Sequence, residues 1–343
     1  MSGGIAQLVA QGAQDVHLVG DPQVSFFRST YKRHTNFSQV RQRQTIQGNP
    51  AKNGMSSVRF ERKGDLLSYT YLAGKVNATG AAALNIADNI DKVELYIGGQ
   101  LIDSQDNAYI KDVWRNIQAP NNSKAEDQNG GAALCPLHFF FCDNWANSLP
   151  LVALQYHDVT MRIYWSAAAA VATETYELWS NYIYLDTAER EMFAEKPLDM
   201  LITQVQKNNK SGKNMQEFSF NHPIAFIATP ETSATTVVAT DVLTFSINGT
   251  TVGDPSLTTP HYNEVPRFYN QFNSSLTTEV VPRFCIPFGL DLYRTQPSGS
   301  LNFSRLDSAR LNSSGGTFNQ DFYAVNYNVL HIEKGMGGLL YSN

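Results

Sequence analysis

Apolar and polar residues alternate along most of this chain with a period of two, the pattern of a β-strand with one buried face. The clearest examples are Thr160–Trp165, Tyr176–Tyr184 and Phe322–Ile332. Two further strands end in short turns: Val93–Ile97 continues into Gly98-Gly99, and Leu243–Ile247 continues into Asn248-Gly249. These turn residues reach the positive φ values that a tight hairpin requires. The pattern predicts an all-β protein.

Helical signals are few and short. Ser104 is placed to cap a helix over Gln105–Ile117, and Asp186 is placed to cap a helix over Thr187–Phe193. The acidic stretch that begins at Asp186 ends at Pro197, and it is the natural linker between two halves of the chain. We therefore expect helices only as connectors.

The two halves repeat the same order of features. The matching features are the turns at Gly98 and Asn248, the connectors Tyr109–Trp114 and Tyr262–Phe272, the segments Pro136–Asp143 and Ile286–Asp291, and the strands ending at Tyr184 and Ile332. The turns, segment ends and strand ends lie 148 to 150 residues apart. So long a period indicates two domains, each with its own core, rather than a solenoid.

A β-domain of this length with many short strands is typical of a sandwich or a jelly roll. We predict two tandem eight-stranded jelly rolls with short connector helices. The predicted limits are residues 1–24 for an N-terminal arm, 25–190 for the first roll and 191–343 for the second.

Composition supports a folded structure with a hydrophobic core. Of the 343 residues, 42% are hydrophobic and only 17% are charged, which argues against disorder and against coiled coils. The three cysteines, without a CxxC pair, fit a reducing compartment. We find neither a membrane-spanning apolar stretch nor a secretory signal at the start, so we expect a soluble protein made inside the cell.

Charge is unevenly distributed along the chain. The net charge is −5, yet residues 28–63 carry nine Lys or Arg and one acidic residue, Glu61. This basic segment thus differs in sign from the remainder, and it gives the molecule two electrostatically distinct regions. The segment is equally consistent with an ordinary solvated strand surface. Sequence-specific nucleic-acid binding is not expected.

Candidate catalytic and metal-binding motifs are weak. The seven histidines show no HxH or HExxH spacing, and the glycine-rich stretches match no phosphate-binding loop. Cys135 and Cys142 flank His138, but the spacing fits no zinc site, which favours buried thiols. We predict no catalytic residue, cofactor or metal ligand. The four tryptophans are expected in the core: Trp114, Trp145, Trp165 and Trp179.

Five segments of the chain resemble the major capsid proteins of the nucleocytoplasmic large DNA viruses. They are Phe26–Phe37, Leu149–Val159, Tyr184–Arg190, Pro297–Asp307 and the end of the chain from Ala324–Val329 through Gly335–Asn343. They appear in the family's order and extend over essentially the whole length. The chain looks short for this family, which leaves room for a shorter paralogue.

The resemblance implies a double jelly roll and a structural role without catalysis. It implies a homotrimeric, pseudo-hexagonal capsomer that contacts neighbouring capsomers in an icosahedral shell around an inner membrane and a double-stranded DNA genome. It further implies minor capsid and penton proteins as partners, location in the virion capsid, assembly in the host cytoplasm, and an N-terminal arm at the capsomer base.

The basic segment overlaps the first resembling segment, and we therefore expect its side chains to face the inside of the shell. The residues concerned are Arg28, Lys32, Arg33, Arg41, Arg43, Arg59, Arg62 and Lys63. Two alternatives stay open. One is a minor or paralogous shell protein of the same kind of virus, and the other is a carbohydrate-binding protein built from two sandwiches.

Overall fold

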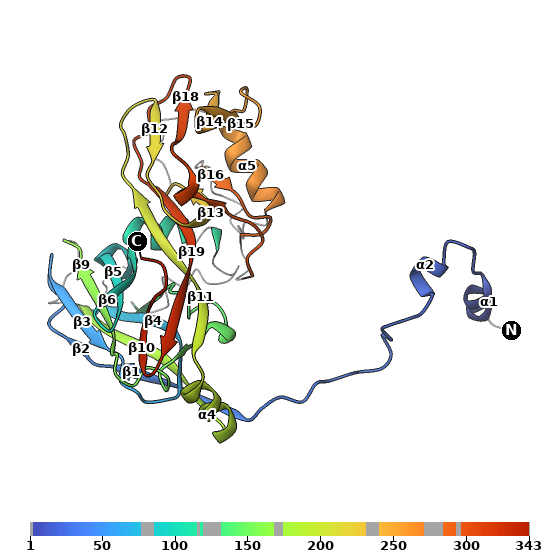
Figure 1. Ribbon diagram of the computed structural model, residues 1–343, viewed down its shortest axis with the longest axis horizontal. Coiled ribbons are helices and arrows are strands. Elements are labelled where there is room, and N and C mark those ends of the chain that lie inside the picture. The colour runs from blue at the N-terminus through green and yellow to red at the C-terminus, as the bar shows by residue number, and fades with distance from the viewer. Residues whose placement is uncertain are drawn as a thin grey trace. The chain divides into compact units, whose positions relative to one another are not determined.

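The computed structural model describes residues 3–76, 86–114, 117–118, 132–167, 174–230, 240–270, 284–292 and 296–342. It contains two compact units, residues 1–36 and residues 37–343 (Figure 1). The first unit has two short helices, α1 (Gly3–Val9) and α2 (Val16–Val19), and neither contains a buried residue. The second unit holds all the strands of the described chain.

Residues 37–185 form two antiparallel sheets, which we call sheets A and B and together roll 1. Sheet A has the order β1 (Phe37–Gln44), β10 (Glu174–Leu185), β4 (Leu66–Val76), β7 (Ala132–Pro136), with β8 (Leu149–Pro150) also paired to β4. Sheet B has the order β2 (Ile46–Gln47), β3 (Met55–Arg59), β9 (Val159–Trp165), β5 (Ile90–Ile97), β6 (Gln100–Asp106).

Residues 198–339 form sheets C and D, which together are roll 2. Sheet C has the order β11 (Leu198–Asn208), β19 (Phe322–Glu333), β13 (Pro223–Ala228), β16 (Cys285–Pro287); β17 (Leu301–Asn302) pairs with β13, and β20 (Met336–Leu339) with β19. Sheet D has the order β12 (Met215–Phe218), β18 (Ala309–Ser313), β14 (Leu243–Ile247), β15 (Thr250–Val252).

The two rolls have the same topology. Without the short strands β2, β8, β17 and β20, each roll has eight strands. In chain order, the first, third, sixth and eighth of them form one sheet, and the other four form the second sheet. This is the strand arrangement of a jelly roll, so the predicted all-β double jelly roll is confirmed. β10 and β19 are each 12 residues long and start 148 residues apart, which confirms the duplication seen in the sequence.

The predicted hairpins are confirmed, and their turns have the expected backbone. Gly98 and Gly99 join β5 to β6 with φ values of 58° and 83°, and Asn248 and Gly249 join β14 to β15 with φ values of 49° and 80°. Residues with positive φ at both turn positions match the twist of the flanking strands. β9 alternates strictly between buried and half-buried residues, as its sequence pattern predicts.

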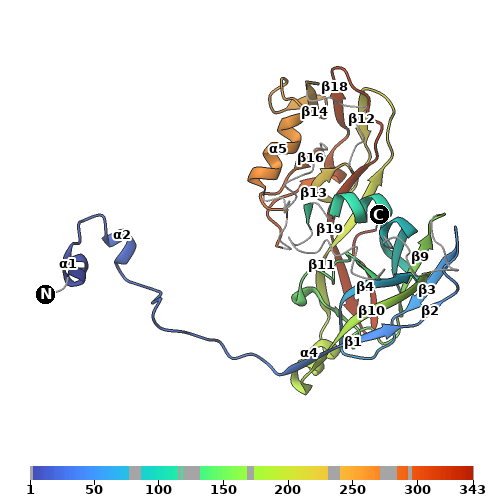
Figure 2. The same ribbon diagram turned by 180° about the vertical axis from the view of Figure 1, so that it is seen from behind.

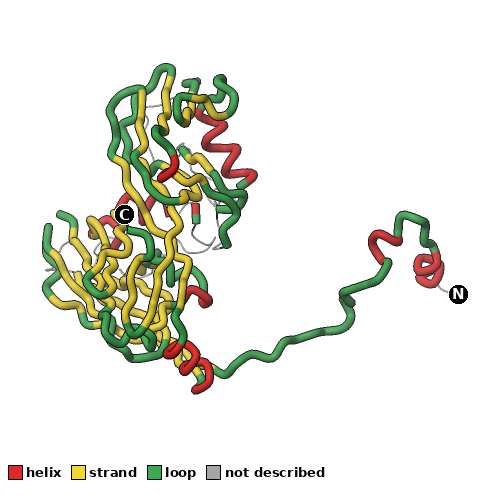
Figure 3. Tube along the Cα trace, in the orientation of Figure 1, coloured by secondary structure: helices red, strands yellow, loops and turns green. Residues whose placement is uncertain are grey.

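Within residues 37–343, the helices in Figure 3 are short and connect strands. α4 (Thr187–Glu195) links the rolls, and its N-cap Asp186 accepts a hydrogen bond from the Thr187 N–H, as predicted. In the part of residues 37–343 that the structure describes, the other named helical elements are η1 (Ile86–Asn89), η2 (Tyr109–Trp114), η3 (Trp145–Asn147), η4 (Phe303–Arg305) and α5 (Thr259–Tyr269). Residues 115–116 and 271–272 of the predicted connectors lie outside the described residues.

The predicted cap at Ser104 is wrong. Ser104 lies inside β6, where it pairs with Glu94 of β5, so its backbone belongs to the sheet. The pairing continues to Asp106, and the Asp106 carboxylate accepts the Tyr109 N–H at 3.0 Å. Because residues up to Asp106 pair with β5, the helical connector begins only after Asp106.

The prediction that all four tryptophans lie in the core is only partly correct. Trp114 and Trp165 are buried, Trp179 is half-buried, and Trp145 is 69% exposed. Trp145 is in the single turn η3, whose N-cap Asn144 bonds the Ala146 N–H. An isolated turn on the surface has no buried face, and this explains why the prediction for Trp145 was wrong.

Candidate functional site

Sheet C is buried on both faces, and this makes it the junction between the rolls. Ile224, Ile227 and Ala324 pack inside roll 2, whereas Phe226 and Val325 on the opposite face belong to the hydrophobic cluster of roll 1. In Figures 1 and 2, β11 and β19 accordingly cross the middle of the 37–343 unit. The hydrophobic cluster of roll 1 therefore continues across the junction onto one face of sheet C, while roll 2 keeps a second cluster of its own.

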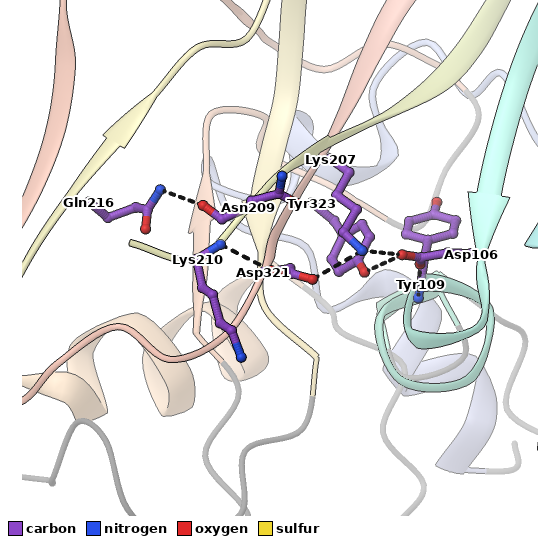
Figure 4. Close-up of polar contacts among 8 residues, drawn as sticks. All are labelled: Asp106, Tyr109, Lys207, Asn209, Lys210, Gln216, Asp321 and Tyr323. Carbon is purple, nitrogen blue, oxygen red and sulfur yellow. Dashed lines mark hydrogen bonds and ion pairs between the residues drawn. The ribbon is translucent and has the colours of Figure 1, made fainter. Parts of the chain in front are cut away.

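A polar network at the edge of this junction joins the rolls. The Lys207 Nζ on β11 lies 2.8 Å from Asp106 Oδ2 on β6 and 3.0 Å from Asp321 Oδ2 (Figure 4). The Tyr323 hydroxyl donates to Asp106 Oδ2 at 2.6 Å. Burial lowers the pKa of Lys207, but the two carboxylates outweigh it and raise that pKa above its ordinary value. Lys207 therefore stays charged and bridges both rolls.

The same network orders the loop before β12. The Lys210 N–H donates to Asp321 Oδ1 at 3.0 Å, and Gln216 Nε2 bonds Asn209 (Figure 4). Burial raises the pKa of Asp321, but the Lys210 N–H and the Lys207 ammonium group together hold it below its ordinary value. The pKa of the Tyr323 phenol is raised, first by burial and then by the neighbouring Asp106. The phenol therefore remains a hydrogen-bond donor.

Asp103 lies deeper in the junction and is fully buried. It accepts hydrogen bonds from the Val205 N–H of roll 2 at 2.9 Å and from Gln105 Nε2 at 2.6 Å. Gln204 of roll 2 donates to the Ile102 carbonyl. Burial raises the pKa of Asp103 to about 6, against the opposing effect of these hydrogen bonds and of His138. The junction thus contains a carboxyl group that titrates near neutrality.

A cleft of about 550 Å³ opens between the rolls. Its lining includes Trp114, Phe140 and Asp143 from roll 1 and Phe226, Thr203 and Tyr327 from roll 2. His138 stacks on Trp114 and lies 2.7 Å from Asp143. Burial raises the pKa of the Cys142 thiol to about 12, so this cysteine stays protonated and is a poor nucleophile. The cleft is a packing feature of the junction.

The C-terminal hairpin attaches roll 2 to roll 1 at a second place. The Tyr156 N–H donates to the Gly335 carbonyl at 2.9 Å, and the Gly337 N–H donates to His157 Nδ1 at 3.2 Å. A Cβ at Gly337 would lie 2.7 Å from Leu154. Gly335 and Gly337 thus allow a close approach between the rolls.

The predicted basic residues are divided among three places. Arg28, Lys32 and Arg33 are exposed in the 1–36 unit. Arg41 and Arg43 are exposed on β1, where Arg43 pairs with Glu177 at 3.0 Å.

The other three basic residues lie at the end of roll 1 that faces the β8–β9 loop. Arg59 and Arg62 both approach Asp158, at 2.8 and 4.0 Å, and Lys63 pairs with Glu61 at 3.1 Å. Arg62 also donates to the Gln155 carbonyl at 2.7 Å. Partly exposed ion pairs of this kind stabilise a fold by only about 0–1 kcal/mol each. Their side chains therefore remain available to a partner.

The junction residues were missed at the sequence level. Asp106 and Tyr323 are 217 positions apart, and no local pattern connects them. One signal was present: Phe322–Val325 is continuously apolar, whereas the matching stretch Glu174–Glu177 of roll 1 is mixed. Continuous apolar runs are typical of strands buried on both faces.

Among the described residues, no group of three or more His, Cys, Asp or Glu side chains is arranged to hold a metal ion. In the same part of the chain, no helix combines the length and the apolar character required to cross a membrane. The features found among the described residues are the packing surfaces between the two rolls.

Comparison with known proteins connects these surfaces to a family. Residues 25–188 match the family model described as "Major capsid protein N-terminus". The chain is 33% identical to the major capsid protein of Pyramimonas orientalis virus and 30% identical to that of Paramecium bursaria Chlorella virus 1, in each case over 100% of both proteins. These alignments span 397 and 440 positions, so the relatives carry insertions that this chain of 343 residues lacks.

Solved structures show the same relationship. A chain of the PBCV-1 virus capsid superimposes with a TM-score of 0.79 at 25% identity, covering 93% of this chain and all of that one. The Faustovirus major capsid protein superimposes with a TM-score of 0.62 at 13% identity, covering 94% of each chain, which shows a common fold.

Proposed function

The chain belongs to the major capsid protein family of large DNA viruses, and from this premise we propose that three copies form a pseudo-hexagonal capsomer of a viral shell. The observation that carries this proposal is the duplication of the roll with an unchanged strand order. Three copies supply six similar rolls, and a three-fold ring of six similar walls approximates a hexagon. Such units tile an icosahedral surface.

Light scattering coupled to size-exclusion chromatography tests the trimer. The expected species has three times the 38.1 kDa mass of the chain, without higher aggregates. A protein that remains monomeric at micromolar concentration would contradict the proposal, because shell-forming interfaces of obligate assemblies typically bury about 2,000 Å² or more.

We also propose that the basic residues face the interior of the shell, together with the N-terminal unit. The support is the exposure of Arg28, Lys32 and Arg33 and the clustering of Arg59 and Arg62 around a single carboxylate. Excess positive charge suits anionic lipid headgroups and acidic protein surfaces. Minor capsid proteins, penton proteins and the inner membrane are the partners that we propose there, with assembly in the host cytoplasm.

Trypsin distinguishes an interior from an exterior location of these residues. In intact particles the bonds after Arg28, Lys32 and Arg33 should resist cleavage, and in dissociated capsomers the same bonds should be cut rapidly. Equal cleavage rates in the two samples would place the segment outside the shell.

A second candidate is a shorter paralogue within the same kind of shell. It is favoured by the length of the alignments, since both relatives carry insertions that this chain lacks. Quantitative mass spectrometry of purified particles separates the two roles. The major protein should be the most abundant shell component, whereas a paralogue should be present in far fewer copies. In either role the proposed activity is structural, without catalysis.

A further inference from the structure

Hydrogen-bond donors surround the buried carboxylate of Asp103. Its Oδ1 accepts the backbone N–H of Ser104 at 3.0 Å and that of Val205 at 2.9 Å. Its Oδ2 accepts Gln105 Nε2 at 2.6 Å. The two backbone groups are fixed by the strands that contain them, whereas a side-chain amide can rotate. Of these three donors, Gln105 is therefore the one that can respond to a change at the carboxylate.

Gln105 also connects Asp103 to a more distant part of roll 1. The same Nε2 group donates to the His138 carbonyl. Gln105 and His138 are 2% and 4% exposed, so little water is available to replace this hydrogen bond. His138 begins the segment His138–Asp143, which we call the cleft segment, and three of its residues line the cleft between the rolls. One side-chain amide thus joins the carboxylate to a wall of the cleft.

Protonation changes what Oδ2 requires of its neighbours. Burial raises the pKa of Asp103 to about 6, so the carboxylate takes up a proton as the pH falls from 7 to 5. Oδ1 already accepts two fixed N–H groups, which leaves Oδ2 to carry the proton. Its new O–H then faces the Gln105 Nε2 donor, and two donors cannot bond each other. Half a turn of the amide resolves the conflict, because Gln105 Oε1 then accepts the carboxyl O–H.

This rotation breaks the connection to His138. Nε2 serves both acceptors in the unprotonated state, and after the rotation it no longer donates to the His138 carbonyl. Gln105 Oε1 takes the place of the donor, and two acceptor oxygens at that separation repel each other. The cleft segment therefore loses one of the contacts that hold it to β6.

Other ionisable groups lie on the elements that pack against β6. In the described part of the chain they are His138 and Asp143 on the cleft segment, Tyr109 in η2, Lys92 and Glu94 on β5, Lys207 on β11, and Asp291 across the cleft. Burial raises the pKa of the Tyr109 phenol, which stays neutral. Lys92 pairs with Glu94 at 2.7 Å, and Lys207 pairs with two carboxylates at the edge of the junction. His138 is thus the group whose titration must be separated from that of Asp103.

Roll 2 lacks these side chains at the matching place. The preceding hairpin turns are 150 residues apart, so Asp103 and Gln105 correspond to Gly253 and Pro255. Neither of these residues has a side chain that can titrate or donate a hydrogen bond. Ile286–Asp291, the counterpart of the cleft segment, therefore provides an internal control.

We propose that Asp103 and Gln105 form a proton-operated switch, in which protonation of the carboxylate rotates the amide and releases the His138 carbonyl. The bond from the Val205 N–H to Oδ1 is kept in both states, so the rolls stay joined while one wall of the cleft loosens. Such a switch responds to transfer from a neutral to an acidified compartment. It does not depend on the number of copies in the assembly.

Hydrogen exchange measured by mass spectrometry tests the switch on the full chain. The Cys142 N–H, which bonds the Phe139 carbonyl, is one of the amides that report on the cleft segment. After correction for the intrinsic effect of pH on exchange, protection of this segment should fall about tenfold between pH 7 and pH 5. Protection of Ile286–Asp291 should not change. Constant protection of the cleft segment would overturn the proposal.

Two variants separate the parts of the switch. Asp103→Asn places an N–H donor where the carboxyl O–H forms, so Gln105 should be rotated and the cleft segment weakly protected at both pH values. Gln105→Met removes the bond to His138 and leaves Asp103 able to titrate. Its cleft segment should also be weakly protected at both pH values, while its free energy of unfolding still depends on pH.

Titration of His138 is the competing explanation. It would leave the pH-dependent loss of protection intact in Asp103→Asn and Gln105→Met, and that result would overturn the switch. The matched control is Asp143→Asn, which removes the carboxylate beside His138 and should keep the full pH response. A single cooperative melting transition at pH 7 checks that each variant folds. If Asp103→Asn does not fold, Gln105→Met decides by the same criterion.

Discussion

Lys207 is the residue at which charge most directly joins the two rolls. Its ammonium group lies between Asp106 of roll 1 and Asp321 of roll 2, and the side chain is 42% exposed. Water screens such a bridge, so its net contribution is smaller than the two short distances suggest. The Tyr323 hydroxyl and the Tyr109 N–H share the Asp106 carboxylate, which keeps the carboxylate partnered when the lysine is removed.

Substitution Lys207→Met should lower the free energy of unfolding by about 1 kcal/mol, because it removes both ion pairs and keeps most of the aliphatic chain. Urea unfolding measures this change. The matched control is Lys334→Met, which removes the well-exposed pair with Glu333 and should produce no measurable change. Equal effects of both substitutions would show that the bridge between the rolls has no special role.

Asp103 should make stability depend on pH. Its pKa in the folded protein is about 6, above the ordinary value of 3.8, because burial disfavours the charged carboxylate. As the pH falls from 7 to 5, the folded state therefore takes up a proton that the unfolded state does not. The group then adds stability on acidification, by roughly 1 kcal/mol over this interval.

The variant Asp103→Asn removes this titration. The gain in unfolding free energy between pH 7 and pH 5 should be about 1 kcal/mol smaller in Asp103→Asn than in the unmodified protein. Urea unfolding at both pH values provides the comparison. Identical pH dependence in the two proteins would mean that Asp103 is already neutral, or still charged, across the whole interval.

At the scale of elements, close approaches between loops decide where glycine is required. Gly98 and Gly99 both have positive φ, which any side chain would strain. They differ in their surroundings: a Cβ at Gly98 would lie 2.3 Å from His157 Nδ1, whereas nothing lies within 4 Å of a Cβ at Gly99. His157 in turn contacts the Gly337 carbonyl of the C-terminal hairpin at 2.9 Å.

Gly98→Ala should therefore destabilise the protein more than Gly99→Ala. Backbone strain should lower the free energy of unfolding of both variants by about 1 kcal/mol. Only Gly98→Ala also displaces the His157 ring, which should lower it by a further amount of about 1–3 kcal/mol. Thermal unfolding of the two variants gives the difference directly. Equal melting temperatures would indicate that the ring moves aside without loss.

At the scale of the whole molecule, the hydrophobic cluster that extends from roll 1 onto sheet C makes the two rolls dependent on each other. One hydrophobic cluster contains the roll 1 interior and also Phe226, Tyr323 and Val325 of sheet C. Separating the rolls would expose these side chains, and burial of each large apolar side chain contributes about 1.5–3 kcal/mol. The second cluster lies inside roll 2 alone.

Calorimetry should consequently show one cooperative transition for residues 37–343, although the chain has two rolls. The measured calorimetric enthalpy should agree with the van't Hoff enthalpy. Two separate transitions, with roll 2 unfolding while roll 1 stays native, would contradict this coupling between the rolls.

Much of this architecture was predictable from the sequence because it depends on local rules. The hairpins at Gly98 and Asn248 follow from turn chemistry, and the start of α4 follows from the Asp186 cap. The duplication was visible because the same turns and strands return at nearly constant spacing. The prediction failed at Ser104, where pairing with β5 overrides the helix signal. It failed again at Trp145, whose exposure depends on a surface turn.

The sequence by itself determined the strands, the turns and the division into two similar rolls, since alternation and turn residues act between near neighbours. Only the tertiary structure decided that sheet C is covered on both faces and sheet A on one. That difference arises from contacts such as Asp106 with Lys207 and Tyr323, between residues about 100 and 217 positions apart. Packing between distant segments is set by the shape and charge of the folded rolls, and the only local trace of it that we find is the apolar run Phe322–Val325.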